Sequence, residues 1–188
     1  ERGRRTADER RLLETLRPGV VATALRARAH RLRSETRAGL ETGFPTTGEI
    51  RSVVILAAFS DVGFTVPDPQ RAFERMLNEE GYSDNGALGS ARDYYLDNSG
   101  GRFRPTFDVV GPVTLDHPVA YYGANTDYRD ENAEGMIIEA CHKAERAGVD
   151  FSQYDFDNDG KIDNVFVYYA GHNESDGGGM NTVWPHRG

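Results

Sequence analysis

A continuous apolar run in the first third of the chain predicts a buried β-strand. Residues 52–59 (SVVILAAF) contain three β-branched side chains in succession and no charged residue. Strands that are covered on both faces carry such runs in place of strict alternation. Residues 164–170 (NVFVYYA) predict another strand. Residues 103–115 alternate enough to form one long strand, or two short ones broken at Gly111-Pro112.

Helix-start signals and helical spacing predict three helices in the same part of the chain. One begins at Asp68 as N-cap, with Pro69 at the first helical position. A second begins after Ser90, which has Asp93 three residues on, much like a capping box. The clearest spans residues 132–147, where an apolar stripe recurs with the helical period. Its members are Ala133, Met136, Ile137, Ala140, Cys141 and Ala144.

The first 48 residues predict a separate helical segment. Residues 6–17 favour a helix that ends at Pro18-Gly19, and residues 20–40 favour a second one with an arginine-rich face. Residues 42–48 (TGFPTTG) have the composition of a linker, so we place a domain boundary between 1–48 and 49–188. The second part runs strand, helix, helix, strands, helix, strand, which predicts an α/β fold with helices packed on a sheet.

Composition narrows the class of protein. The 188 residues are 38% hydrophobic, enough to bury the core of one domain with a smaller appendage. Every apolar run is far shorter than the roughly 18 residues that cross a bilayer, so we expect no membrane partner. The chain opens on charged residues, without an initiator Met or a signal peptide, so we expect a fragment or a processed product. The single cysteine, Cys141, excludes an internal disulfide, and its place on the apolar stripe predicts a buried, unreactive thiol.

The net charge of −8 conceals an uneven distribution. Residues 1–48 hold eleven arginines and six acids, whereas residues 49–188 hold eleven basic residues and 24 acids. A basic arm of this kind can bind nucleic acid, and it can equally lie on an acidic partner domain. The arm contains no lysine and no interleaved aromatics, and no recognition motif accompanies it. We therefore expect no nucleic-acid partner.

The acidic loop at residues 155–163 (DFDNDGKID) is the most specific chemical signal in the chain. Calcium takes six to eight oxygen ligands, and carboxylates at alternate positions of a tight loop converge on one ion. Gly160, at the sixth position, permits the sharp bend. The candidate ligands are the carboxylates of Asp155, Asp157 and Asp159, the backbone carbonyl of Lys161, and Asp163 acting directly or through water.

The match to an EF-hand is incomplete, because the twelfth position is Phe166 and not Glu. The alternative interpretation is a solvated acidic turn. Four carboxylates at close range repel one another unless a cation is present, which favours calcium. The expected role is structural, fixing the start of the strand at residues 164–170.

The five histidines give no local zinc motif, because no pair has the spacing HxH or HxxxH. His172 follows a predicted strand and is interpreted as a polar turn residue, with a place in a site as the alternative. His186, in Trp184-Pro185-His186, belongs either to a surface tail or to a contact with a site formed by further residues.

Six segments together resemble the first half of the catalytic domain of immune inhibitor A-type zinc metallopeptidases. They occur in the family's order and extend over roughly residues 49–188. The segments are residues 52–61 (SVVILAAFSD), 81–92 (GYSDNGALGSAR), 98–103 (NSGGRF), 120–123 (AYYG), 157–171 (DNDGKIDNVFVYYAG) and 181–186 (NTVWPH).

The resemblance implies a zincin-like α+β fold with a twisted mixed sheet and a later active-site helix bearing HExxH. In that family two histidines and a further downstream residue hold zinc, and the glutamate is the general base for a zinc-bound water. Members are secreted by bacteria and commonly bind calcium, and the loop at 155–163 matches the family's acidic loop. The present sequence contains no HExxH, so no zinc ligand and no catalytic residue is carried over to it.

The expected function is that of a secreted zinc endopeptidase acting on proteins or peptides, as a property of the parent protein. Residues 1–48 correspond to part of a prosegment, and the remainder of the catalytic domain, beyond residue 188, is the expected partner. We expect the 188-residue chain alone to be inactive. The alternative is a non-catalytic calcium-binding module that uses a peptidase-like scaffold for adhesion or partner binding.

Overall fold

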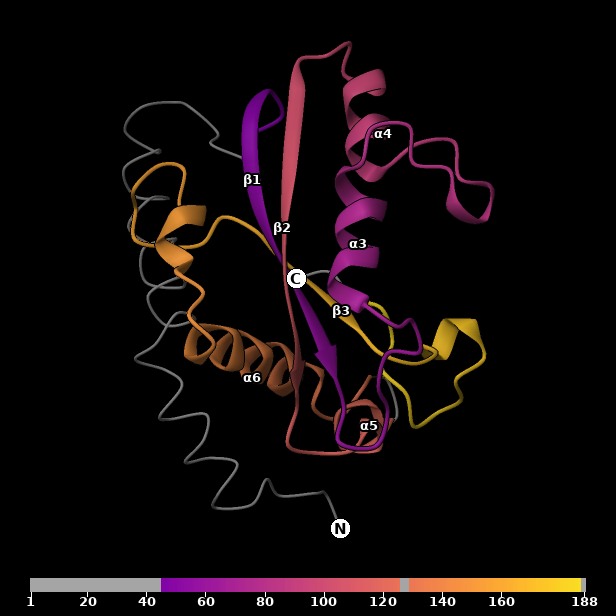
Figure 1. The fold of residues 1–188 in the computed structure, drawn as a ribbon. Helices are drawn as coiled ribbons and strands as arrows, with labels where there is room; N and C mark the ends of the chain where they lie inside the picture. The colour runs from indigo at the N-terminus through magenta and orange to yellow at the C-terminus, as the bar shows by residue number, and fades with distance from the viewer. Residues whose placement is uncertain (1–44, 126–128, 187–188) are drawn as a thin grey trace. The chain divides into compact units, whose positions relative to one another are not determined.

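The computed structural model describes residues 45–125 and 129–186 (Figure 1). The helices predicted at 6–17 and 20–40, and the first three residues of the linker at 42–48, lie outside these residues. The described residues belong to two compact units. The larger is Pro45–Asp150 together with Asn164–Gly188, and the smaller contains Phe151–Asp163.

A parallel sheet forms the centre of the larger unit. Its strands are β1 (Gly48–Ala58), β2 (Phe103–Thr114) and β3 (Val165–Tyr169). The strand order is β2-β1-β3, and both pairings are parallel. The predicted strands and the α/β fold class are confirmed. Residues 103–115 prove to hold one long strand, whose register shifts opposite Leu56, where β2 contains Gly111-Pro112.

Strand β1 is the core of the sheet, as its apolar run predicts. Val53 and the next four residues, through Ala57, have no exposed surface. Side chains alternate between the two faces of a strand, so both faces of β1 must be covered. Both of its edges are also hydrogen-bonded, one to β2 and the other to β3.

Of the four α-helices in the described residues, the first two begin where their capping residues predict. The four are α3 (Pro69–Asn78), α4 (Ala91–Asn98), α5 (Val119–Gly123) and α6 (Ala133–Arg146). Short 3₁₀ turns occupy Asp84–Gly86, Phe151–Tyr154 and Glu174–Asp176. The side chain of Asp68 accepts the Arg71 N–H at the start of α3. Ser90 and Asp93 form the full capping box of α4. Among the described residues, no helix is long and apolar enough to cross a membrane.

Helices cover both faces of the sheet (Figure 1). On one face, side chains from α3 pack with alternate residues of β1 and β2 in a cluster made of Val54, Leu56, Leu77, Phe107 and Val109. Helix α6 lies on the other face. Its buried residues are Met136, Ile138, Ala140, Cys141 and Ala144. Ile137, a member of the predicted stripe, stays 37% exposed, and Ile138 is buried in its place.

Two side chains of α3 cover the outer edge of β2. The Asn78 amide donates to the Phe107 carbonyl at 2.8 Å and accepts the Phe107 N–H at 2.9 Å, as a neighbouring strand would. Gln70 donates to the Val109 carbonyl at 2.9 Å, two residues further along the same edge. Unpaired edges invite association with other chains, so these contacts both anchor α3 and protect β2.

We predict that Asn78→Ala lowers the free energy of unfolding by about 2 kcal/mol, because it removes both hydrogen bonds to Phe107 and leaves two half-buried strand groups without partners. Urea denaturation followed by circular dichroism measures the change. Asn98→Ala is the matched control, since that amide bonds only to Tyr94 of its own helix at an exposed position. Equal losses in the two variants would contradict the edge-capping role.

Candidate functional site

The acidic loop lies in the smaller unit, between the 3₁₀ turn at Phe151–Tyr154 and the start of β3. Two residues with left-handed backbone conformations allow it to fold tightly: Asn158 with φ 55° and Gly160 with φ 84°. Asn and Gly adopt this region at the lowest cost. The sharp bend that the sequence assigns to Gly160 is therefore confirmed, and Asn158 supplies a second one.

The loop brings three carboxylates together. One oxygen from each of Asp155, Asp157 and Asp159 lies within 4.8 Å of the others. Calcium–oxygen bonds are about 2.3–2.6 Å long, so two oxygens on one ion are at most about 5 Å apart. The three oxygens therefore fit a single calcium coordination sphere. Within the described residues, no other group of three or more His, Cys, Asp or Glu side chains converges in this way.

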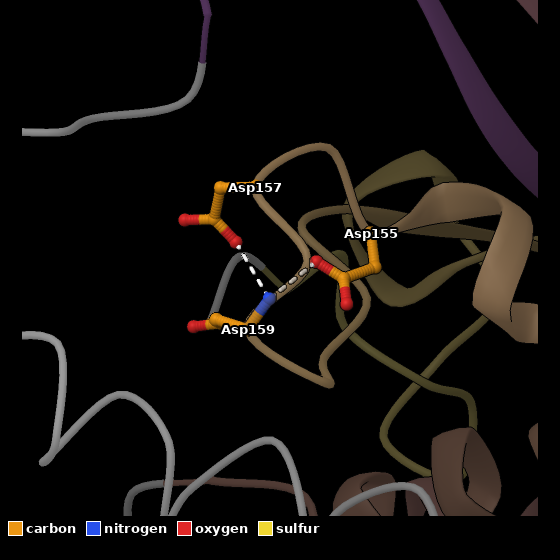
Figure 2. A group of neighbouring side chains, drawn as sticks. All are labelled: Asp155, Asp157 and Asp159. Carbon is orange, nitrogen blue, oxygen red and sulfur yellow. Dashed lines mark hydrogen bonds between the residues drawn. The ribbon is translucent and has the colours of Figure 1, made fainter.

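Backbone N–H groups of the loop hold these carboxylates in place (Figure 2). The Asp159 N–H donates to an oxygen of Asp155 at 3.0 Å and to an oxygen of Asp157 at 3.2 Å. The Gly160 N–H donates to the second Asp155 oxygen at 2.7 Å. These bonds orient the carboxylates of Asp155 and Asp157 within the loop.

The other two candidate ligands take different places. Asp163 is not one of the three converging groups; its Oδ2 accepts the Phe156 N–H at 2.8 Å, and its own N–H donates to the Tyr154 carbonyl at 3.0 Å. It thus closes the base of the loop. Lys161, predicted to act through its carbonyl, places its Nζ 3.6 Å from Oδ2 of Asp159.

The twelfth position of the loop offers no ligand. Phe166 lies inside β3, where it is paired with Val54 of the central strand. The loop therefore differs from an EF-hand as its sequence predicts: a strand follows it, and its ligand set stays incomplete without oxygens from other sources.

A second polar cluster, in the larger unit, is centred on Asp130. The Asp130 side chain is 1% exposed. Its Oδ2 accepts the Trp184 N–H at 2.8 Å and lies 2.7 Å from Nε2 of His186. Its Oδ1 is buried and has no hydrogen-bond partner among the described residues. Asp130 therefore ties the segment around Trp184 to the loop before α6.

Neighbouring contacts fix the same segment. The Tyr169 hydroxyl donates to the Val183 carbonyl at 2.8 Å, and burial, with a contribution from the charge of Asp130, raises the pKa of Tyr169 to about 12. A side chain at Gly123 would overlap the backbone of Thr182 and Val183, so glycine is required there. Sequence reasoning singled out His186 and missed Asp130, because no local pattern marks a carboxylate whose partners lie more than fifty residues away.

His172 and Cys141 take the places expected of a polar turn residue and of a buried, unreactive thiol. His172 is exposed, with its Nδ1 3.3 Å from an oxygen of Asp176. Cys141 is buried, and burial raises the pKa of its thiol to about 11, which disfavours the reactive thiolate.

One known protein family matches the part of the chain that contains the acidic loop and the Asp130 cluster. The catalytic domain of the immune inhibitor A peptidase M6 family matches residues 69–188, from the start of α3 onward. The chain belongs to this family. The matched range contains the acidic loop and the Asp130 cluster, and β1 lies before it.

Named relatives of this chain include two bacterial proteins. It is 26% identical over 141 residues to the pre-pro-metalloprotease PrtV of Vibrio cholerae, covering 64% of this chain and 15% of that protein. It is 28% identical over 139 residues to immune inhibitor A of Bacillus thuringiensis, covering 61% of this chain and 20% of the relative. The chain thus spans a fifth or less of the length of these relatives.

We predict that Asp130→Ala mobilises the segment around Trp184, since it removes the acceptor for the Trp184 N–H and for His186. Trp184 is the sole tryptophan, so its fluorescence anisotropy should fall and its emission shift to the red. Asp130→Asn retains an acceptor oxygen and should stay nearer to wild type. Unchanged anisotropy in the alanine variant, with the fold intact by circular dichroism, would show that Asp130 does not anchor the segment.

Proposed function

We propose that this chain is the front part of the catalytic domain of a secreted, zinc-dependent endopeptidase, and that its acidic loop binds calcium. The observation that carries the peptidase proposal is the match of the peptidase M6 catalytic domain to residues 69–188. The observation that carries the calcium proposal is the convergence of three loop carboxylates within 4.8 Å.

For the parent protein, the proposed reaction is hydrolysis of peptide bonds in protein or peptide substrates. The names of both relatives are consistent with this, since one is a metalloprotease and the other gives the peptidase family its name. The term pre-pro in the name of the Vibrio protein supports a secreted precursor. Accordingly, we assign residues 1–48 as part of a prosegment and residues 49–188 as the N-terminal part of the catalytic domain.

The zinc that the family implies would polarise the scissile carbonyl and activate a water molecule. Catalytic zinc is usually held by histidines with a carboxylate. No histidine joins a group of three possible metal ligands among the described residues, and the sequence has no HExxH. The donor set of the described residues therefore does not fit catalytic zinc, and we assign the zinc ligands to other residues of the parent protein.

The donor set does fit calcium, which prefers oxygen ligands and tolerates irregular geometry. Asp155, Asp157 and Asp159 place three negative charges on five residues, and a divalent cation would relieve their repulsion. Their orientation by backbone N–H groups means that little ordering remains to be done on binding. The proposed role is structural: the ion would fix the chain that leads directly into β3.

We predict that calcium raises the midpoint of thermal unfolding of the 188-residue chain. At a hundredfold excess over the dissociation constant, linkage gives about 2.7 kcal/mol of added stability. Asp157→Ala, which removes one of the three converging carboxylates, should abolish most of the shift. Asp176→Ala removes an exposed acid outside the loop and is the control. A chain with no shift in millimolar calcium would rule out the calcium site.

The 188-residue chain should not cleave casein when supplied with zinc and calcium, because its sequence has no HExxH and its described residues assemble no zinc site of the family's kind. Release of labelled casein peptides by the purified chain is the measurement. Cleavage that a zinc chelator blocks would contradict this prediction and would show that the chain contains the catalytic centre.

A further inference from the structure

Lys161 is the only basic residue of the acidic loop. The calcium-loop pattern uses its backbone carbonyl and assigns no role to its side chain. The side chain is 9% exposed, and its Nζ is buried without a hydrogen-bond acceptor among the described residues. The Nζ lies 3.6 Å from Oδ2 of Asp159, too far for a hydrogen bond and close enough for an ion pair.

Burial of the Lys161 ammonium costs free energy unless nearby negative charges compensate for the lost hydration. A buried ammonium that makes no hydrogen bonds loses its hydration without full compensation. What compensates it is the field of the three converging carboxylates, of which Asp159 is the nearest. The ammonium therefore reduces the net charge of the group formed by Lys161 and these carboxylates from −3 to −2.

The same ammonium opposes an arriving cation. An ion bonded to Asp159 would lie about 2.3–2.6 Å from one of its oxygens. Bonded to the oxygen nearest Lys161, the ion would be at most about 6 Å from Nζ. At that separation, repulsion between a divalent ion and a unit charge weakens binding about tenfold, even with the dielectric constant of water.

We propose that Lys161 sets the affinity of the calcium site by acting as a built-in counter-ion. Its ammonium partly neutralises the carboxylates when no ion is bound and competes electrostatically with calcium for Asp159. The inference rests on the proposed calcium function and adds a determinant of how much calcium the loop requires. A lysine at this position would suit a site that fills only where calcium is abundant.

Side-chain variants separate charge from packing. Lys161→Met keeps a long apolar side chain and removes the charge, whereas Lys161→Arg keeps the charge. Arg104→Met removes the same formal charge from an exposed position on β2. At physiological ionic strength the screening length is about 8 Å, so a change in net charge alone has little effect on a site.

Titration calorimetry with calcium chloride tests the proposal. We expect Lys161→Met to bind calcium about tenfold more tightly than wild type, with Lys161→Arg and Arg104→Met within about twofold of it. Equal or weaker binding by Lys161→Met overturns the counter-ion role and leaves the calcium site intact. Absence of calcium binding by the wild-type chain overturns the proposed calcium function itself, so the two failures are distinguishable.

A second readout uses the fact that the chain has two lysines, Lys143 and Lys161. Lys143 belongs to α6, where its Nζ donates to Asp116 at 2.6 Å. In a chain labelled biosynthetically with ¹³C-lysine, the Lys161 side-chain signal should shift as calcium is added and saturate with the calorimetric midpoint. The Lys143 signal should stay fixed. A wild-type chain that binds calcium without moving the Lys161 signal contradicts the proposal.

Discussion

Complete enclosure of β1 is the constraint on which the rest of the larger unit depends. The strand has covered faces and hydrogen-bonded edges, so its neighbours must run alongside it in fixed register. Both neighbours are parallel to it, and parallel strands end at the same edge of a sheet. The chain segments that follow the three strands are therefore brought together at that edge. Side chains that function in open α/β sheets are commonly found in this position.

Long-range hydrogen bonds connect the chain segments that meet at this edge of the sheet. The Ser60 N–H donates to the His117 carbonyl at 3.1 Å, and Asp61 accepts the Val119 N–H at 2.9 Å, so the segments after β1 and β2 hold one another. Glu139 of α6 accepts the Tyr122 hydroxyl at 2.6 Å, which ties α5 to α6. The Asp130 cluster then adds the segment around Trp184. Each tie joins elements that are separated in the sequence.

The sequence predicted those features whose causes are local. Asp68 and Ser90 cap helices through neighbours three residues away, and the apolar run of β1 is itself the signal for burial on both faces. Asn78 and Asp130 act through side-chain contacts that no spacing rule describes, and the same holds for Lys161 in its proposed role. Asn78 meets a strand 29 residues away, and Asp130 meets His186 at a separation of 56. The pattern of a calcium loop specifies the carbonyl at the seventh position and says nothing of the side chain there.

A calcium site and a catalytic zinc site require different ligands. Calcium is a hard cation that accepts carboxylates from one flexible loop, so a run of nine residues can supply most of a site. Catalytic zinc needs nitrogen ligands in tetrahedral positions with one position open, and those ligands must be oriented by further contacts. The described residues provide the first arrangement and, at Asp130 and His186, a buried carboxylate that orients one imidazole. One such imidazole is not a zinc site, since three protein ligands are the rule. The described part of the family's catalytic domain thus supplies the enclosed sheet and the acidic loop that we propose to bind calcium. The proposed zinc ligands would have to be positioned against that framework.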